Sequence, residues 1–295
     1  MTTLVVFGAD GLLGRALAEV ALPAGWRRRL VGRRQADIRN GGQVLSALAG
    51  LSRAVVVNAA AYTAVDKAES EPELAFAVNR DGVAHLAGHL AVLGIPLIHM
   101  STDYVFDGQR KSPYAEDAEP APLSVYGNSK LAGERAVLRA AQTNAVVRTS
   151  RVFGRHGRCF PQLVLELGRQ RHTLSMVDDQ IACPTPADDL ARALVRMAAH
   201  MIAPQDAGRI SGLYHYCGEG PVSWYDFAAA LSTRAEQHGI RLSPLRAIPS
   251  RDYPQPARRP SWSALACDRL RRDCGILPPD WRQGLSEYLP GWLDV

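Results

Sequence analysis

The feature of this 295-residue sequence that most constrains its fold is a regular alternation of two patterns over its first half. Short apolar runs rich in β-branched residues are separated by stretches with the apolar spacing of helices. Strict alternation of this kind builds right-handed crossovers between parallel strands. The sequence therefore predicts an α/β fold with a doubly wound parallel sheet covered by helices on both faces. Strands are expected at 3–8, 29–34, 53–60, 95–101 and 144–150, and helices at 12–22, 41–50, 72–94 and 124–140.

The alternation stops after Val152, and the second half has a different organisation. Helices are expected at 160–170, 186–200 and 222–239, with Ser223 as an N-cap, and GLYHYCG at 212–218 is typical of a short strand. The five prolines of 243–262 indicate a loop. We therefore predict a nucleotide-binding domain over 1–152 and a smaller C-terminal lobe over 153–295, some segments of which return to the sheet. A lobe above the carboxyl ends of the strands would form a substrate cleft.

The stretch GADGLLG places Gly8, Gly11 and Gly14 directly after the first predicted strand. Glycines permit a sharp turn and let a pyrophosphate approach backbone N–H groups, while the following helix N-terminus favours negative charge. Their spacing is GxxGxxG, and their position between a strand and a helix indicates a dinucleotide site in a Rossmann-like sheet. The alternative is a glycine-rich turn without a ligand.

The end of the second predicted strand reads Gly32-Arg33-Arg34, where many dinucleotide folds have an acid for the ribose 2′-hydroxyl. Arginine accommodates a 2′-phosphate instead, so Arg33 favours NADPH, with NADH as the alternative. These arginines could also be simply solvated. Asp37-Ile38 is positioned to lie against the adenine, and the small residues of 57–63 would let the backbone approach the cofactor.

A second motif combines Tyr126 and Lys130, four residues apart and therefore on one face of a helix. A cation beside a tyrosine favours the phenolate, so we expect a lowered Tyr126 pKa and a tyrosine that acts as a general acid. Thr102, at the end of the fourth strand, could hydrogen-bond the same carbonyl oxygen, and Lys130 could also hold the nicotinamide ribose. The three residues are the predicted catalytic set for reduction of a ketone by hydride.

Several stretches together resemble the extended short-chain dehydrogenase/reductase family, and within it the dTDP-4-dehydrorhamnose reductases. They occur in order along nearly the whole chain, and AVDKAE and STDYVFDG are the most specific to this branch. The matching stretches are VNAAAYTAVDKAESEPELA (57–75), STDYVFDG (101–108), VYGNSKLAGE (125–134), VVRTSRVFG (146–154), DDQIACPT (178–185), GLYHYCG (212–218) and RRPSWSAL (258–265).

The resemblance implies that NAD(P)H reduces the C4 keto group of dTDP-4-dehydro-β-L-rhamnose, with Tyr126 as the proton donor. It implies sugar contacts from Thr102, Asp103, Tyr104, Val65 and Tyr126, and a role for Arg259 at the nucleotide end. The cofactor contacts that it implies, besides Lys130, are Gly11, Leu12 and Leu13 of the first turn, Asp37 and Ile38, and Ala61, Tyr62 and Thr63.

Two positions depart from the family pattern. Ala16 stands where some members have a carboxylate that binds Mg²⁺ at a dimer interface, so we predict no metal site, although a homodimer without metal remains compatible with the sequence. Arg151 stands where the family commonly has Trp near the sugar, and could contact a phosphate, a sugar hydroxyl or solvent. The alternatives are therefore a related nucleotide-deoxysugar reductase or epimerase, or a non-catalytic NADP-binding regulatory subunit.

Composition excludes several other classes of protein. A net charge of +5 without strong clustering argues against nucleic-acid binding and suits small anionic ligands. No apolar run approaches the length of a membrane span, and MTTLVVFG has no basic signal-peptide region. The five cysteines form no CxxC pair, which fits free thiols in the reducing cytoplasm and argues against a zinc site.

Overall fold

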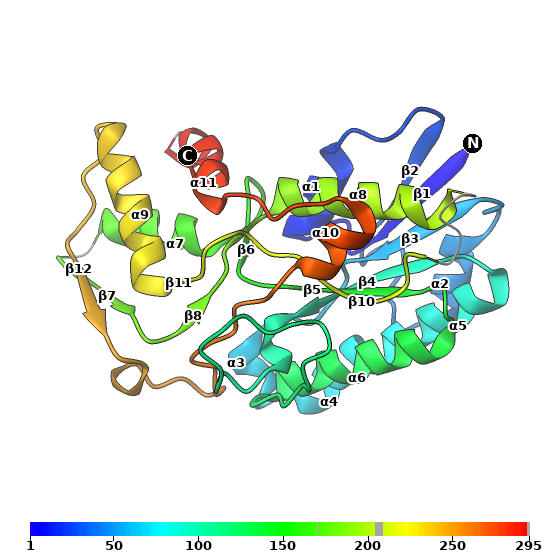
Figure 1. Ribbon diagram of the computed structural model, residues 1–295, viewed down its shortest axis with the longest axis horizontal. Coiled ribbons are helices and arrows are strands. Elements are labelled where there is room, and N and C mark those ends of the chain that lie inside the picture. Colours follow the sequence, from blue (N-terminus) through cyan, green and yellow to red (C-terminus); the bar gives the residue numbers. More distant parts are fainter. Residues whose placement is uncertain (171, 204–208, 294–295) are drawn as a thin grey trace.

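A six-stranded parallel sheet forms the centre of the molecule in a computed structural model, which describes residues 1–170, 172–203 and 209–293. The strand order is β10-β5-β4-β3-β1-β2, and every neighbouring pair is parallel. This order confirms the predicted doubly wound α/β fold (Figure 1). The strands are β1 Thr2–Phe7, β2 Trp26–Val31, β3 Ala54–Asn58, β4 Leu97–Thr102, β5 Ala145–Thr149 and β10 Gly212–His215.

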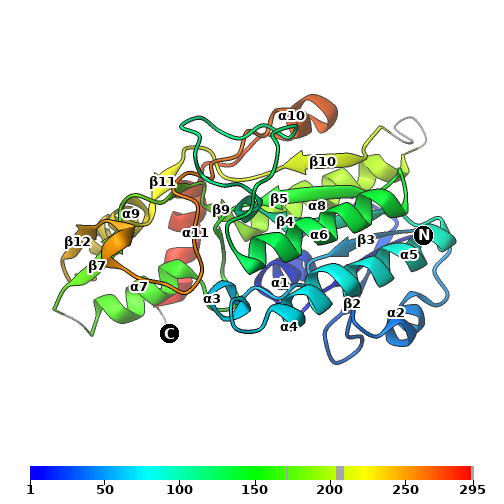
Figure 2. The ribbon, with the colours of Figure 1, turned by 90° about the horizontal axis from the view of Figure 1, so that it is seen from below.

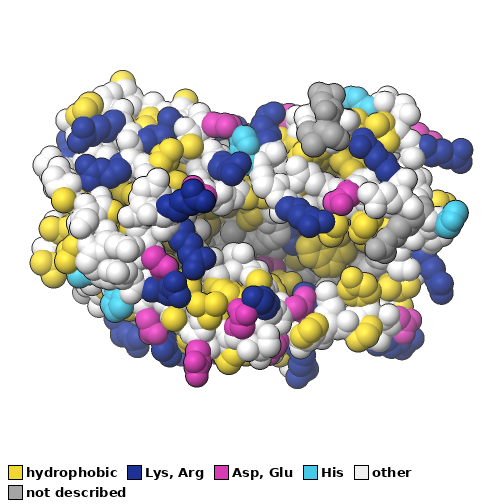
Figure 3. All heavy atoms as spheres, turned by 180° about the vertical axis from the view of Figure 1, so that it is seen from behind, with side chains coloured by type: hydrophobic (Ala, Val, Ile, Leu, Met, Phe, Trp, Pro, Cys, Tyr) yellow, Lys and Arg dark blue, Asp and Glu magenta, His cyan; other side chains and the backbone are white. Residues whose placement is uncertain are grey.

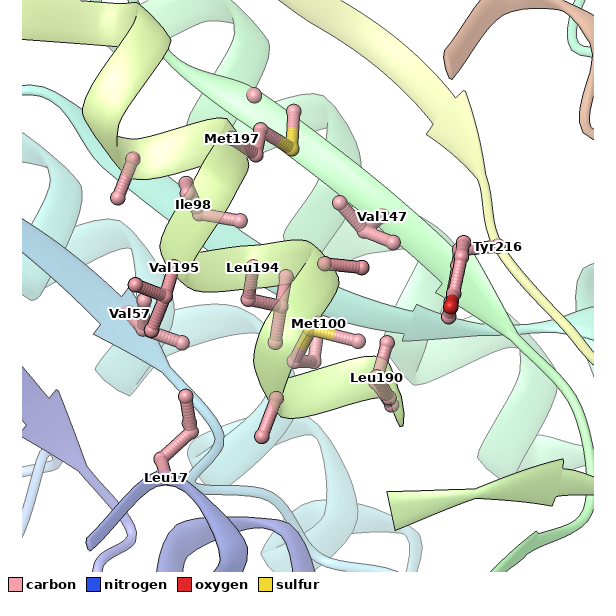
Figure 4. Close-up of a cluster of buried hydrophobic side chains, with 14 of the residues drawn as sticks. Leu17, Val57, Ile98, Met100, Val147, Leu190, Leu194, Val195, Met197 and Tyr216 are labelled. Atoms are coloured by element: carbon pink, nitrogen blue, oxygen red, sulfur yellow. The ribbon is translucent and has the colours of Figure 1, made fainter. Parts of the chain in front are cut away.

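Helices cover both faces of the sheet, as Figure 2 shows. One face packs on α1 (Leu12–Glu19) and α8 (Ala187–Ile202), and Figure 4 shows Leu190, Leu194 and Met197 of α8 lying over the strands. The other face packs on α2 (Gly41–Leu48), α5 (Val83–Leu93) and α6 (Val125–Ala140). Alternate residues of each strand serve the two cores, because successive side chains in a strand point to opposite faces. Segments beyond residue 152, namely α8 and β10, thus return to the sheet.

The expected strand at 29–34 is displaced, because β2 starts at Trp26 and ends at Val31. β2 is an edge strand in which only Val31 is fully buried, so the strand accommodates Arg27 to Arg29 despite their charge. Charged side chains on an edge strand discourage pairing with other chains. Arg33 therefore lies in the turn after the strand. The first helix also ends early, at Glu19, three residues before Leu22, which precedes Pro23.

The helix expected at 72–94 is continuous but not uniform. It consists of α4 (Pro72–Phe76), a π-helical segment (Ala77–Gly82) and α5. A short helix that the sequence analysis did not anticipate, α3 (Val65–Ala68), precedes it. π-helical turns inside α-helices are frequent at functional sites.

The rest of the C-terminal half forms a smaller lobe at one end of the long axis (Figure 1). Its core contains Phe153, Phe227, Trp281, Tyr288 and Trp292. Ser223 caps α9 in a capping box, as predicted. The lobe and its connections contain β6 Val152–Phe153, α7 Phe160–Gly168, β7 Leu174–Val177, β8 Ile181–Ala182, β9 Thr185–Pro186, β11 Val222–Ser223, α9 Trp224–Gln237, β12 Leu245–Ile248, α10 Asp268–Cys274 and α11 Trp281–Leu293. In the described part of the chain, no helix has the length and apolarity needed to span a bilayer.

Candidate active site

The turn after β1 is shaped by close contacts that only glycine permits. Gly8 has φ +78°, and a Cβ atom there would meet the backbone nitrogen of Ala60 at 2.5 Å. A Cβ on Gly14 would meet the carbonyl oxygen of Gly8 at 2.2 Å. α1 begins immediately after Gly11, whose position as N-cap provides no side-chain hydrogen bond. The first N–H groups of this helix are therefore available to a phosphate.

A cavity of about 440 Å³ extends from this glycine turn along the ends of β1 and β3. It lies where the strand order reverses, which is the usual ligand crevice of open α/β sheets. Seven predicted cofactor residues line it: Gly8, Gly11, Arg33, Asp37, Ile38, Ala61 and Tyr62. Small residues Ala59 and Ala60 form its floor beside β3, and Asp10, Arg39, Lys67 and Glu71 complete its polar wall.

The other predicted cofactor residues lie outside the wall of this cavity. Leu12 and Leu13 pack against the hydrophobic core, and Gly14 lies against the backbone of Gly8 and Ala9 in the turn. Thr63 is exposed beyond Tyr62. Lys130 is buried against β4.

The predicted catalytic residues meet where α6 crosses the end of β4. Thr102 is the last residue of β4, and its hydroxyl is a hydrogen-bond partner of the Tyr126 side chain. Lys130 donates from Nζ to the carbonyl oxygen of Met100, at 2.6 Å. The Tyr104 ring meets the Tyr126 ring edge-on, with centroids 5.9 Å apart. Ser124 caps α6 by accepting from the Gly127 N–H, which fixes the start of the helix two residues before Tyr126.

The expected lowering of the Tyr126 pKa is wrong for this state of the protein. Burial raises the pKa of Tyr126, and the hydrogen bond with Thr102 only partly opposes that effect. Burial also lowers the Lys130 pKa, to about 8, and its ammonium faces a backbone carbonyl. Tyr126 is therefore protonated at neutral pH, as a proton donor in a reduction must be.

The predicted sugar-contacting residues surround this catalytic set. Asp103 is buried, and its carboxylate accepts from Ser150 Oγ at 2.9 Å and Ser263 Oγ at 2.5 Å. Burial raises the Asp103 pKa despite these bonds. Tyr104 is a hydrogen-bond partner of Arg259, and Val65 begins α3, which packs on α6.

Arg259 connects the late loop to α3. Its Nη1 and Nη2 donate to Asp66 Oδ1 and Oδ2, at 2.9 and 2.7 Å, and its half-buried guanidinium also reaches Tyr104. Bidentate pairs of this type fix direction as well as distance. Asp66 was not among the predicted site residues, although it lies in the AVDKAE motif.

Arg151 points neither to solvent nor to an open cavity. Its Nη1 donates to the carbonyl oxygen of Val222 at 2.8 Å and its Nη2 to that of Gln180 at 2.7 Å. The guanidinium stacks on the Trp224 ring, 3.9 Å from its centroid. Among the described residues other than glycine, Arg151 alone has a positive φ, 43°. Its strained backbone and three contacts hold the smaller lobe against the end of β5.

Two polar residues that were not among the predicted site residues join the segments that surround the site. Asn79, in the π-helical segment, exchanges two hydrogen bonds with the Tyr62 backbone and donates to Ser129 Oγ of α6. Glu134 accepts from Ser101 Oγ and forms a buried ion pair with Arg148. A polar residue at an apolar-face position of a helix is the one signal that could have identified either.

Acidic and thiol side chains do not gather into a metal site: across the described ranges, no cluster of three or more potential ligands occurs. Ala16 is buried between α1 and the sheet. All five cysteines are free, although Cys217 and Cys267 have sulfur atoms 3.8 Å apart.

On the face shown in Figure 3, Lys and Arg side chains border a hollow near the middle of the molecule.

Comparison with known proteins gives one consistent result. The family model described as "RmlD substrate binding domain" matches residues 1–292. A dTDP-4-dehydrorhamnose reductase of Sinorhizobium fredii is 42% identical over 280 residues, covering 95% of this chain and 94% of the relative. One of Aggregatibacter actinomycetemcomitans is 39% identical over 289 residues, covering 97% and 98%. The crystal structure of dTDP-4-dehydrorhamnose reductase from Bacillus anthracis in complex with NADP superposes with a TM-score of 0.89 at 31% identity, covering 98% of each chain.

Proposed function

Since the chain belongs to the dTDP-4-dehydrorhamnose reductase family, we propose that it reduces the C4 keto group of dTDP-4-dehydro-β-L-rhamnose to give dTDP-L-rhamnose. It is an NAD(P)H-dependent oxidoreductase. The observation that carries the proposal is the meeting of Thr102, Tyr126 and Lys130 at the end of β4, beside a cavity suited to a dinucleotide.

The cavity suits NAD(P)H because of features of this chain. Side chains on Gly8 or Gly14 would collide with the Ala60 backbone or the Gly8 carbonyl oxygen, so glycine at both positions keeps the turn tight. The uncapped start of α1 supplies N–H donors for a pyrophosphate. Ile38 and Ala36 offer an apolar surface for the adenine. When bound, the reduced nicotinamide supplies the hydride that reaches C4 of the sugar.

Tyr126 supplies the proton that completes the reduction. Its hydroxyl hydrogen moves to the C4 oxygen as that oxygen gains negative charge, so the ketone becomes a secondary alcohol. Thr102 Oγ, adjacent to the phenol, orients the same oxygen by donating to it. Lys130 stabilises the phenolate left on Tyr126 and holds the nicotinamide ribose, with its position set by the Met100 carbonyl.

The smaller lobe would bind the sugar nucleotide. We assign sugar contacts to Asp103, Tyr104 and Val65, and we assign Arg259 to the nucleotide end, since it lies at the junction of both halves. Arg151 would shape the sugar pocket through Trp224. In this assignment residues 1–152 bind the cofactor and 153–295 mainly bind substrate, apart from α8 and β10. Free cysteines suit the reducing cytoplasm, which we propose as the location.

A second candidate is reduction of a related nucleotide-deoxysugar, and the contacts of Arg151 are the observation that favours it. An arginine committed to backbone carbonyls and to Trp224 gives the pocket a different wall from the Trp common in the family.

The test is oxidation of NADPH at 340 nm with dTDP-4-dehydro-β-L-rhamnose made in situ from dTDP-glucose by the two preceding enzymes. Wild type should turn over, and Tyr126→Phe should lose about 100-fold or more in kcat because the proton donor is gone. Tyr253→Phe, at an exposed tyrosine of the late loop, is the control and should behave as wild type. Absence of turnover in wild type with either NADPH or NADH would refute the assigned substrate.

A further inference from the structure

The adenosine end of the cofactor cavity holds two guanidinium groups that share one carboxylate. Arg33 and Arg39 both line the cavity, and both face Asp37. Arg39 donates from Nε to Asp37 Oδ1 at 3.0 Å and from Nη2 to Oδ2 at 2.6 Å. Arg33 Nε lies 3.7 Å from Asp37 Oδ2. The sequence motif pointed to Arg33 alone, whereas Arg39 reaches the same place from the other side of the turn.

The carboxylates of Asp10 and Asp37 are already hydrogen-bonded to N–H groups of the turn after β2. Gly32 occupies the place next to the end of β2, and a Cβ atom there would meet Asp10 Oδ2 at 2.3 Å and Gln35 Oε1 at 2.7 Å. Gly32 therefore places no acidic side chain at the end of β2, and any larger residue there would have to displace Asp10 and Gln35. Asp10 itself accepts from the Arg33 N–H at 3.1 Å, which fixes it to the turn. Asp37, which also lines the cavity, is engaged by Arg39.

The pairing leaves Arg39 oriented and only partly used. A guanidinium has five N–H donors, and Asp37 engages Nε–H and one hydrogen of Nη2, so three remain. The Arg39 side chain is 38% exposed, against 76% for Arg33. Less side-chain freedom is lost when an already oriented guanidinium binds a ligand.

We propose that Arg39, together with Arg33, binds the 2′-phosphate of NADPH and makes the enzyme select NADPH over NADH. This inference rests on the proposed reductase function, which names the cofactor class but not the preference. The two guanidinium groups match a phosphate in charge and in hydrogen-bond geometry. Asp37 acts as a positioning residue, because its bidentate pair directs the free N–H groups of Arg39 into the cavity.

The experiment compares kcat/KM for NADPH and NADH, with the same sugar nucleotide, in Arg39→Ala, Arg33→Ala and Arg34→Ala. Arg34 is exposed in the same turn but lies outside the cavity wall, so it is the matched control. Removal of Arg39 should lower the NADPH-to-NADH ratio by roughly 10- to 100-fold, the usual effect of charge-assisted hydrogen bonds. Arg34→Ala should leave the ratio unchanged, and Arg39→Lys should recover part of it.

The failure of this inference can be separated from failure of the proposed function. Calorimetric titration with NADP⁺ and NAD⁺ needs no sugar nucleotide, so it measures the cofactor ratio even if the assigned substrate is wrong. An unchanged ratio in Arg39→Ala would overturn the assignment of Arg39. So would an equal loss of affinity for both cofactors, since that would indicate general damage to the cavity.

Discussion

The buried ion pair between Glu134 and Arg148 allows a quantitative test of how the catalytic helix is held. Arg148 of β5 donates to Glu134 from Nε at 2.8 Å and from Nη2 at 2.7 Å, and Ser101 Oγ donates to the same carboxylate at 2.5 Å. Both charged side chains are 3% exposed. Glu134 lies one turn beyond Lys130 on α6, so this pair ties the helix to two strands.

Replacement of Arg148 by Met should lower the free energy of unfolding by about 3–5 kcal/mol, because a buried carboxylate would keep only the Ser101 hydroxyl as partner. Glu134→Leu should cost a similar amount by leaving the guanidinium unpaired. The double variant should cost much less than the sum, since apolar residues of similar size often replace a buried ion pair with little loss. The expected coupling energy is therefore about 3 kcal/mol or more.

Urea unfolding followed by far-UV circular dichroism measures each free energy. Arg80 is a matched control, because its Nε lies 2.6 Å from Asp81 Oδ1 and its guanidinium lies 5.0 Å from the Phe76 ring. Arg148 has the same ring distance, 5.0 Å to Phe106, but the Arg80–Asp81 side chains are 48% and 47% exposed. Arg80→Met should thus cost about 1 kcal/mol at most. A cost for Arg148→Met no larger than this would refute the reasoning.

Four further predictions follow from the site. The buried Lys130 ammonium, whose pKa is about 8, loses its proton as the pH rises above that value, so kcat/KM for NADPH should fall there; a flat alkaline limb would contradict the assigned role. Because this pKa is lower than in the unfolded chain, the unfolded state binds more protons than the folded state between pH 8 and about 10.5. The free energy of unfolding of wild type, measured in urea relative to that of Lys130→Met, should therefore rise with pH across that range. Asp66→Asn should raise the KM for the sugar nucleotide more than it lowers kcat, because the bidentate partner that orients Arg259 is lost. The same substitution should lower the free energy of unfolding by about 1 kcal/mol or less. An unchanged KM would show that Arg259 does not take part in substrate binding. Gly14→Ala should weaken NADP⁺ binding at least about tenfold in calorimetry, because its Cβ would meet the Gly8 carbonyl oxygen at 2.2 Å; wild-type affinity would show that the turn can shift.

The sheet could be predicted from sequence because each strand there is a local apolar run. β2 was displaced because an edge strand with Arg27 to Arg29 meets solvent, so its burial does not follow the pattern of a buried strand. The π-helical segment was missed for a different reason. Asn79 bonds Tyr62 and Ser129, which lie 17 and 50 residues away in sequence, and no local pattern encodes such partners.

The predicted site shows the same division between local and tertiary information. Tyr126 and Lys130 are four residues apart on one helix, so their common face follows from sequence alone. Arg39 reaches the cavity only because the turn after β2 brings it beside Asp37. The direction of the Tyr126 pKa shift was wrong because spacing shows that Lys130 shares its face, but not that Tyr126 is buried, and burial raises its pKa.

The contacts between α6 and β4 explain why the two elements form one catalytic unit. Tyr126, Lys130 and Glu134 recur every four residues, and each meets one of the last three residues of β4: Thr102, Met100 and Ser101. The deepest of these contacts is an ion-paired carboxylate, and the outermost is the proton donor. A helix fixed at Glu134 and at Lys130 leaves Tyr126 little freedom to move away from Thr102. The buried pair, two turns beyond Tyr126, should therefore contribute to the position of the reactive hydroxyl.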